Sequence, residues 1–275
     1  MKVSISTDME GISGLVDLSQ INPLGLDYHR GRQLMTQDIN AAIRGAFRAG
    51  ATEVVVAGGH GANGARNVLD EDLHPDARLR SGKSRKYRLQ NVDESFDAAL
   101  QIGYHSRQGT GGVIDHTITS RAVYEIRING RPIGEIGLNG LAAGWHGVPV
   151  ALVSGDDVLA GETKEWFPWA EAVVVKKTVS RHAAICMHPT RAQALIEERT
   201  AAALNRLPDM KPLQLEAPYT AELQYRLTSY ADMAEDPAGV TRVDGTTVSY
   251  TTDNIPDLLR TINMCIKLAG VGQPD

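Results

Sequence analysis

The sequence contains little cysteine, and its thiols fit no known site pattern. Among 275 residues there are two cysteines, Cys186 and Cys265, which lie far apart and match no metal-binding or redox spacing. Two thiols in a chain of this length indicate a reducing compartment rather than a disulfide-stabilised secreted fold. We therefore expect both cysteines to be free and buried in the core.

Segments that could enter or cross a membrane are also missing. The N-terminal stretch MKVSISTDMEG has neither the apolar region nor the small-residue cleavage site of a signal peptide. No apolar run approaches the length that spans a bilayer. We expect a soluble, cytoplasmic protein with no membrane partner.

The chain has neither the excess of positive charge nor the aromatic content that would indicate nucleic-acid binding. The formal net charge is −5, and aromatic residues make up 5% of the chain. The densest basic run extends from Arg78 to Arg88 and contains one aromatic residue, Tyr87. Such a run is more typical of a solvated loop than of a nucleic-acid interface, so we expect no nucleic-acid partner.

The first half of the sequence does show a regular alternation of strand and helix patterns. Runs of apolar and β-branched residues predict strands at 2–6, 53–57, 124–128 and 148–153. Residues 96–103 form a helix-then-strand pattern whose strand ends before Tyr104 and His105. Helical spacing of apolar residues predicts helices over 29–49 and 137–145, and Asn129-Gly130 predicts a hairpin turn. This order is typical of α/β proteins with a mostly parallel sheet and flanking helices.

The second part of the chain has a different order of elements. A strand at 171–177 and an alanine-rich helix at 189–207 come first. Two strands and a final helix follow, over 222–227, 246–250 and 255–268. This order predicts a smaller α+β C-terminal domain. We place the α/β domain at residues 1–168 and the smaller domain at 169–275.

Metal-capable side chains follow three of the predicted strands. Asp8 and Glu10 come directly after the first strand, His60 follows the second, and His105 follows the third. Open α/β sheets bind ligands at the carboxyl ends of their strands, so these side chains should lie together. Asp8 and Glu10 are two residues apart, which puts both carboxylates on one side of an extended segment, where a cation would offset their repulsion. Imidazole nitrogens with carboxylate oxygens predict a zinc site, with cobalt or manganese as alternatives.

Each of these residues also has a simpler interpretation. An Asp-x-Glu pair at a strand end is commonly a solvated turn or a helix cap, and a single histidine is more often structural than a ligand. Their joint placement at one edge of the sheet is what favours a metal site. Five further histidines lack that context, and we expect structural or surface roles for His29, His74, His146, His182 and His188.

Several short motifs occur in an order that resembles a known enzyme family. They are STDMEGISG at 6–14, the His60 turn, GYHS at 103–106, GVIDHT at 112–117, PIGEIGLNG at 132–140 and SGDD at 154–157. Each motif alone is weak, but their order over nearly the whole chain is specific. The sequence resembles the zinc-dependent D-aminopeptidases encoded in bacterial dipeptide-transport operons.

This resemblance implies a set of site residues and an assembly. Family members bind two zinc ions, and the matching motifs place the ligands at Asp8, Glu10, His60, His105 and Glu135. Five ligands exceed the three that are usual for one catalytic zinc, which favours a paired site with Asp8 as the bridge. The family's catalytic position corresponds to His116 in GVIDHT. The resemblance further implies a homo-oligomer that forms a decameric ring, with an open dimer as the alternative.

The expected reaction is metal-assisted hydrolysis of the N-terminal residue of short peptides or amides, with D-amino acids implied by the resemblance. We expect His116 to act as a proton shuttle or oxyanion stabiliser rather than as a nucleophile. Its neighbour Asp115 either orients it or has a structural role. The alternatives are L- or β-amino acyl substrates, a phosphohydrolase that uses Lys176, Lys177 or Arg181, and a metal-stabilised binding protein without turnover.

Overall fold

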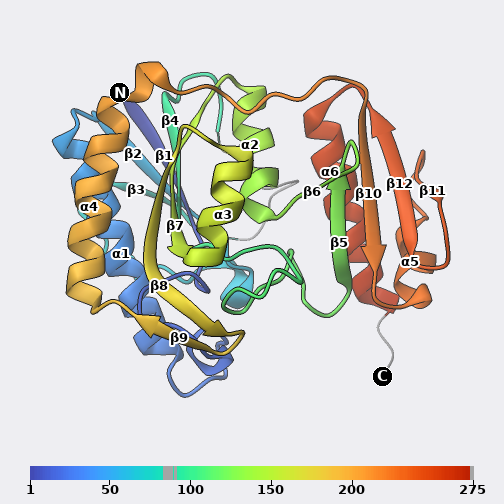
Figure 1. The fold of residues 1–275 in the computed structure, drawn as a ribbon, viewed down its shortest axis with the longest axis horizontal. Helices are drawn as coiled ribbons and strands as arrows, with labels where there is room; N and C mark the ends of the chain where they lie inside the picture. Colours follow the sequence, from blue (N-terminus) through green and yellow to red (C-terminus); the bar gives the residue numbers. More distant parts are fainter. Residues whose placement is uncertain (83–88, 90–91, 273–275) are drawn as a thin grey trace.

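A seven-stranded sheet forms the centre of the larger half of the computed structural model, which describes residues 1–82, 89 and 92–272 (Figure 1). Its strands are β1 (Lys2–Thr7), β2 (Glu53–Gly58), β3 (Arg78–Arg80), β4 (Ala98–Ile102), β7 (Val150–Asp156), β8 (Glu171–Ser180) and β9 (Ala183–Cys186). They lie in the order β3-β2-β1-β4-β7-β8-β9. All neighbours pair in parallel except β8 and β9. The predicted α/β class with a mostly parallel sheet is therefore confirmed.

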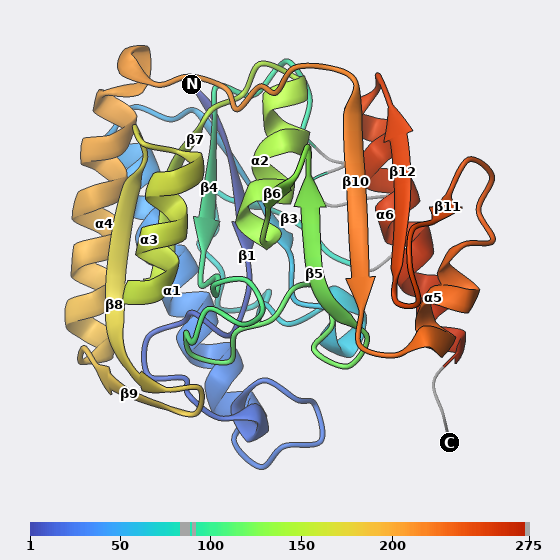
Figure 2. The same ribbon diagram turned by 45° about the vertical axis from the view of Figure 1, so that its right-hand side comes forward.

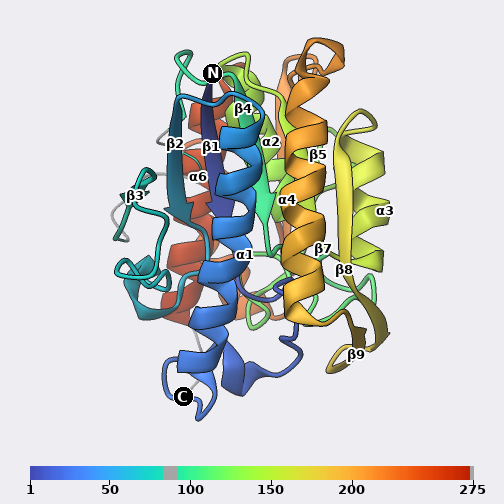
Figure 3. The same cartoon turned by 90° about the vertical axis from the view of Figure 1, so that its left-hand side faces the viewer.

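Helices cover both faces of this sheet, as Figures 1 and 3 show. On one face α1 (Tyr28–Arg48) packs against α4 (Pro189–Asn205), and on the other lie α2 (Glu135–Trp145) and α3 (Asp157–Trp166). Every residue of β4 and β7 is buried. The helices exclude water from both faces, which explains why these strands are mostly apolar rather than alternating between apolar and polar residues.

A second, antiparallel sheet forms the smaller half (Figure 2). It consists of β5 (Val123–Ile128), β6 (Arg131–Pro132), β10 (Tyr219–Tyr225), β11 (Thr241–Arg242) and β12 (Thr247–Thr252), in the order β11-β12-β10-β5-β6. The helices α5 (Thr228–Ala234) and α6 (Ile255–Ala269) belong to this half. Alternate residues of β10 are buried, as expected for a sheet that packs on helices with one face only.

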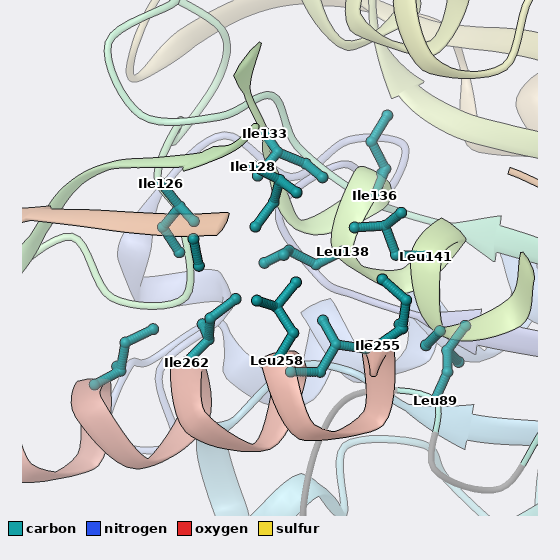
Figure 4. Packing of buried hydrophobic residues seen from close by; sticks show 14 of the residues in the cluster. Leu89, Ile126, Ile128, Ile133, Ile136, Leu138, Leu141, Ile255, Leu258 and Ile262 are labelled. Carbon is teal, nitrogen blue, oxygen red and sulfur yellow. The ribbon is translucent and has the colours of Figure 1, made fainter. Parts of the chain in front are cut away.

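One apolar cluster joins α2, α6 and the five-stranded sheet (Figure 4). Leu138 of α2 lies between the two helices and faces Leu258 of α6, with Ile262 and Ile126 beside them. Leu138 is 1% exposed and Leu258 is fully buried. Burying each such side chain stabilises the fold by about 2 kcal/mol. The contact fixes α6 relative to the first turn of α2.

The predicted division at residue 168 does not follow the two sheets. β8, β9 and α4 come after residue 168 but belong to the seven-stranded half, whereas β5 and β6 come before it and belong to the five-stranded sheet. The chain thus passes between the halves more than once. Local sequence patterns predict a strand but not which distant strand it pairs with, so they could not place this division.

The two cysteines have different surroundings. Both are free; Cys265 of α6 is buried, but Cys186 at the end of β9 is exposed. The expectation of a buried Cys186 is therefore wrong, because β9 is the edge strand of its sheet and packs against a neighbour on one side only.

Two other sequence expectations concern surface features. Within the described residues, none of the helices combines the length and apolarity required to cross a bilayer. In the basic run, Arg78 and Arg80 lie in β3, while residues 83–88 lie outside the described part of the chain.

Candidate metal centre

The carboxyl ends of β1, β2 and β4 lie next to one another at one edge of the large sheet. β1 pairs in parallel with β2 on one side and with β4 on the other. The strand order runs outward from β1 to β3 in one direction and from β4 to β8 in the other, so the topology switches between β1 and β4. Such a switch point opens a crevice beyond the strand ends. The loops that carry the predicted ligands meet there.

Two glycines let the loops after β1 and β4 pack backbone against backbone. The Gly11 N–H donates to the Gly103 carbonyl oxygen at 2.8 Å. A Cβ atom on Gly11 would lie 1.8 Å from the Tyr104 carbonyl oxygen, and Gly103 has a φ of +75°. A side chain at either position would displace a ligand-bearing loop.

Asp8 and Glu10 point to the same side and face His60. The Met9 N–H donates to Asp8 Oδ1 at 3.0 Å and lies 3.2 Å from Glu10 Oε2, so the two carboxylates converge on one peptide group. His60 Nδ1 is 3.2 Å from Asp8 Oδ1 and 3.3 Å from Glu10 Oε1. Asp8 and Glu10 are each 2% exposed. The structure thus brings these three residues together, as their places after β1 and β2 predicted.

His105, Glu135 and His116 form a second group beside Asp8. His105 Nε2 is 3.4 Å from Glu135 Oε1 and 3.9 Å from Asp8 Oδ2. His116 Nε2 is 3.8 Å from Glu135 Oε1, and the two imidazole rings stack with centroids 3.9 Å apart. Asp8 therefore faces ligand candidates from both groups, which is the geometry a bridging carboxylate requires.

Glu135 reaches the site because it is the first residue of α2. The helix begins there rather than at Gly137, two residues earlier than the apolar spacing predicts. A carboxylate in the first turn interacts favourably with the positive end of the helix dipole. The Ile118 N–H also donates to Glu135 Oε1 at 2.7 Å. Strand-end reasoning could not have found this residue, since no strand of the large sheet precedes it.

Each of the three histidines is held by a backbone carbonyl through one ring nitrogen. The contacts are His60 Nε2 to Ile21 O at 3.0 Å, His105 Nδ1 to Ser106 O at 3.0 Å, and His116 Nδ1 to Ile114 O at 2.9 Å. A carbonyl only accepts, so that nitrogen carries the proton, and in a neutral ring the other nitrogen presents a lone pair.

The lone-pair nitrogens of these rings face the buried carboxylates. Two acceptors that face each other repel unless a proton or a cation lies between them. Within the described residues, His105 Nε2 is buried without a hydrogen-bond partner. Metal-binding histidines are characteristically oriented in this way by a second acceptor. The donor set therefore fits a divalent cation such as zinc.

The charges of the cluster shift its pKa values in opposite directions. Burial and the Glu10 charge raise the pKa of Asp8 to about 6. Burial opposes protonation of His105, but Glu135, Glu10 and Asp8 together outweigh it and raise the pKa of His105 to about 10. Burial and the neighbouring His105 lower the pKa of His116. Without a metal, protons on His105 and His60 balance the carboxylates, and metal binding would release them.

Two buried charged residues hold the loop after β1 from behind. Lys176 Nζ of β8 donates to the carbonyl oxygens of Glu10, Ile12 and Leu15. Asp38 of α1 accepts from the Ser13 N–H at 3.1 Å and from Ser13 Oγ at 3.0 Å. Burial lowers the pKa of Lys176 to about 8 and raises the pKa of Asp38 to about 7. Sequence patterns gave no signal for this support, because its members are far apart in the chain.

Asp115 fixes the loop that carries His116 rather than the imidazole itself. Arg181 Nε donates to Asp115 Oδ1 at 2.9 Å, and the N–H groups of Gly109 and Gly111 donate to Asp115 Oδ2 at 2.9 and 3.1 Å. Of the two roles considered for Asp115, these contacts support the structural one. Arg181 and Lys176 are both engaged elsewhere, so neither supplies a free cation for a phosphate.

A cavity of about 850 Å³ opens from these residues towards α6. All members of the cluster except His105 line one part of it, and His105 lies behind them. Apolar residues also line the cavity, including Leu18, Ile21, Ile118, Leu138, Leu259 and Ile262. A cavity of this size with converging polar groups is typical of a small-molecule site. The five other histidines lie outside it; His146, for example, contacts Glu94 at 2.7 Å.

Comparison with known proteins agrees with this geometry. The family model described as peptidase M55, D-aminopeptidase, matches residues 1–264. A D-aminopeptidase from Bacillus subtilis (strain 168) is 42% identical over 214 residues, which are 78% of this chain and 77% of the relative. A solved structure described as the zinc-dependent D-aminopeptidase DppA from Bacillus subtilis, a self-compartmentalizing protease, superposes with a TM-score of 0.94. It is 36% identical and covers 98% of both chains.

Proposed function

The chain belongs to the D-aminopeptidase family, and we propose that it removes the N-terminal D-amino acid from short peptides or amides by means of a dinuclear zinc centre. One observation carries this proposal. Three backbone-anchored histidines turn their free ring nitrogens towards three buried carboxylates that line a cavity. The relative and the solved structure to which the chain is similar are both described as D-aminopeptidases, and the solved structure is described as zinc-dependent.

The proposed ligands fall into two sets that share Asp8. Asp8, Glu10 and His60 would hold one zinc, and Asp8, His105 and Glu135 the other. The separations of 3.2–3.9 Å between their ligand atoms support both sets. When bound, zinc would polarise the scissile carbonyl and activate a water molecule.

His116 is proposed to move protons rather than to hold metal. Its side chain is 15% exposed and lines the cavity, whereas the His105 side chain is fully buried. The lowered pKa keeps His116 neutral, and the Ile114 carbonyl fixes its Nδ1–H, so that Nε2 is the free acceptor. A base in this position can take a proton from the attacking water and return it to the leaving amine.

Substrate binding follows from the two kinds of wall in the cavity. A carboxylate or a metal of this centre suits the free amine of a peptide, which would limit the reaction to the N-terminal residue. The apolar walls formed by Leu138, Leu259 and Ile262 suit the side chains on either side of the scissile bond. Lys176 and Arg181 bind other groups of the protein, and Lys177 is exposed on β8 and is not among the residues that line the cavity. None of the cations considered for a phosphohydrolase is therefore available there.

A panel of chromogenic substrates tests this function directly. D-, L- and β-amino acyl amides and a phosphomonoester are assayed with and without a chelator. We expect chelator-sensitive hydrolysis of the D-amino acyl amide to be the fastest. A clear preference for the L- or β-amides would show that the proposed substrate class is wrong. Hydrolysis of the phosphomonoester alone would show that the proposed reaction is wrong.

We further propose that the chain assembles into a closed homo-oligomer, a ring of ten copies, in the cytoplasm. Exposed apolar side chains support this: Leu24 is 94% and Leu26 99% exposed beside the cavity, and Val179 and Ile185 are 65% and 70% exposed on the β8–β9 hairpin. Patches of this kind mark interfaces between protein chains. Light scattering should give a mass near ten chains, and a mass of one or two chains would contradict the ring.

A further inference from the structure

The cavity has one unusual feature apart from the metal centre: its wall contains two cationic side chains. Among the described residues that line it, Arg121 and Lys267 are the ones that carry a fixed positive charge. Both are exposed to solvent. Arg121 lies between the His116 loop and β5, and Lys267 lies in the last turn of α6.

None of the residues that the structure describes neutralises either cation. Within the described part of the chain, no carboxylate lies within ion-pair distance of Arg121 or Lys267, and neither side chain donates a hydrogen bond. Two other basic residues of this half behave differently: Arg226 donates to the Ser120 carbonyl oxygen, and Arg260 pairs with Asp257 at 3.1 Å. Two cations that line one cavity, with no carboxylate partner among the described residues, would attract an anionic group of a ligand.

The other described side chains of the cavity with a fixed charge are the carboxylates of the metal centre. Asp8, Glu10 and Glu135 line that part, and the apolar side chains of Leu138, Leu259 and Ile262 line the wall that joins it to α6. The order of features is therefore metal centre, apolar wall and basic rim. A short peptide has a matching order, with an amino group and scissile bond that a metal centre can bind, then side chains and a carboxylate.

The position of the rim relative to the metal centre is fixed by packing. Leu138 lies one turn after Glu135 in α2 and packs against Leu258 and Ile262 of α6 (Figure 4). Lys267 follows Ile262 in the same helix. One rigid helix pair thus joins a proposed zinc ligand to a rim cation, so the distance between them can select the length of a substrate.

We propose that Arg121 and Lys267 form a subsite for the C-terminal carboxylate of a short peptide whose N-terminal residue lies at the metal centre. This rests on the proposed aminopeptidase function and names its substrates more closely: free di- and tripeptides rather than amides or long chains. Charge-assisted hydrogen bonds from a lysine and an arginine are the usual way to bind such a carboxylate.

The test compares a dipeptide with an N-terminal D-alanine and its C-terminal amide. Both are assayed for turnover with the zinc-loaded protein, and their binding is measured by calorimetry on the His116→Ala protein, which should not consume them. For the unmodified protein we expect kcat/KM for the free acid to exceed that for the amide by roughly tenfold, mainly through KM. In the Arg121→Gln/Lys267→Gln protein the ratio should fall to about twofold or less, through loss of the free acid's advantage alone.

Lys164→Gln serves as the matched control, because Lys164 is an exposed lysine of α3 outside the cavity. It should keep the ratio of the unmodified protein. Equal kcat/KM for acid and amide in the unmodified protein, or an unchanged ratio in the double variant, would overturn the subsite while the aminopeptidase stands. No turnover of either compound, together with calorimetric preference for the free acid that the double variant loses, would overturn the function and keep the subsite.

Discussion

Asp8 and Glu10, in the seven-stranded half, are each 2% exposed and held from behind by Lys176 and Asp38, whereas the rim cations from the other half are open to solvent. The seven-stranded half places its ligands on short loops locked by backbone contacts. The five-stranded half contributes an apolar helix face and solvent-exposed cationic side chains. The contrast indicates that the first half determines whether the reaction occurs and the second determines which substrates enter.

The largest expected effect is that of Asp8→Asn, in the buried half. The substitution removes the carboxylate shared by both ligand sets, and a catalytic metal contributes several kcal/mol to the transition state. We therefore expect turnover to fall by at least about 10³-fold and the zinc content to fall with it. Atomic absorption and steady-state kinetics check the two effects. Full zinc content with unchanged kcat would show that Asp8 is not a ligand.

His116→Ala should separate catalysis from metal binding. We expect kcat to fall by roughly 10²–10⁴-fold, the range for a positioned acid or base. The zinc content should stay near that of the unmodified protein, because the proposed ligand sets do not include His116. Loss of one zinc per chain would instead make His116 a ligand of the second set, which its distance of 3.8 Å to Glu135 Oε1 also permits.

Lys176→Met tests whether the buried support controls the metal centre. Three carbonyl oxygens, including that of Glu10, lose their shared donor, so the ligand loop should relax. We expect zinc affinity to fall roughly tenfold to a hundredfold, as for other residues that position ligands. The matched control is Lys177→Met, which changes the next, exposed residue of β8. Equal zinc affinity in both variants would remove Lys176 from the account.

Asp38→Asn tests the same support through pH and should have the smallest effect. Burial raises the pKa of Asp38 from 3.8 to about 7, so the folded state favours the protonated form. The resulting stability is fully present below about pH 4 and is lost as pH rises through 7. The free energy of unfolding of the unmodified protein, relative to that of the Asp38→Asn variant, should therefore fall by roughly 1–3 kcal/mol between pH 4 and pH 8. Urea denaturation at both pH values measures this difference in unfolding free energy. A difference that does not change with pH would contradict the raised pKa of Asp38.

The α/β class with a mostly parallel sheet and the positions of four of the proposed ligands could be predicted from the sequence. Strand patterns followed by Asp8, Glu10, His60 and His105 are local signals, and parallel topology brings the strand ends together. The order of the motifs also predicted the family and the aminopeptidase class, and the comparisons confirm both. The roles of the individual ligands and of His116 stay predictions.

Features that depend on distant contacts could not be predicted. Asp38 contacts a residue of the ligand loop 25 positions away and Lys176 one that is 166 positions away, and no sequence spacing shows this. The same holds for the rim cations, because Arg121 and Lys267 share a cavity wall only after α6 packs on α2. It also holds for the division between the halves, which depends on which strands pair rather than on where they lie in the chain.

The central claim is that the buried carboxylates and histidines at the strand ends hold two zinc ions that the reaction requires. The most direct measurement is a zinc titration of metal-free protein, with binding followed by calorimetry and hydrolysis of a D-amino acyl amide assayed at each step. Binding should saturate at about two zinc ions per chain, and activity should reach its plateau at the same point. Full activity in protein without any transition metal would contradict it.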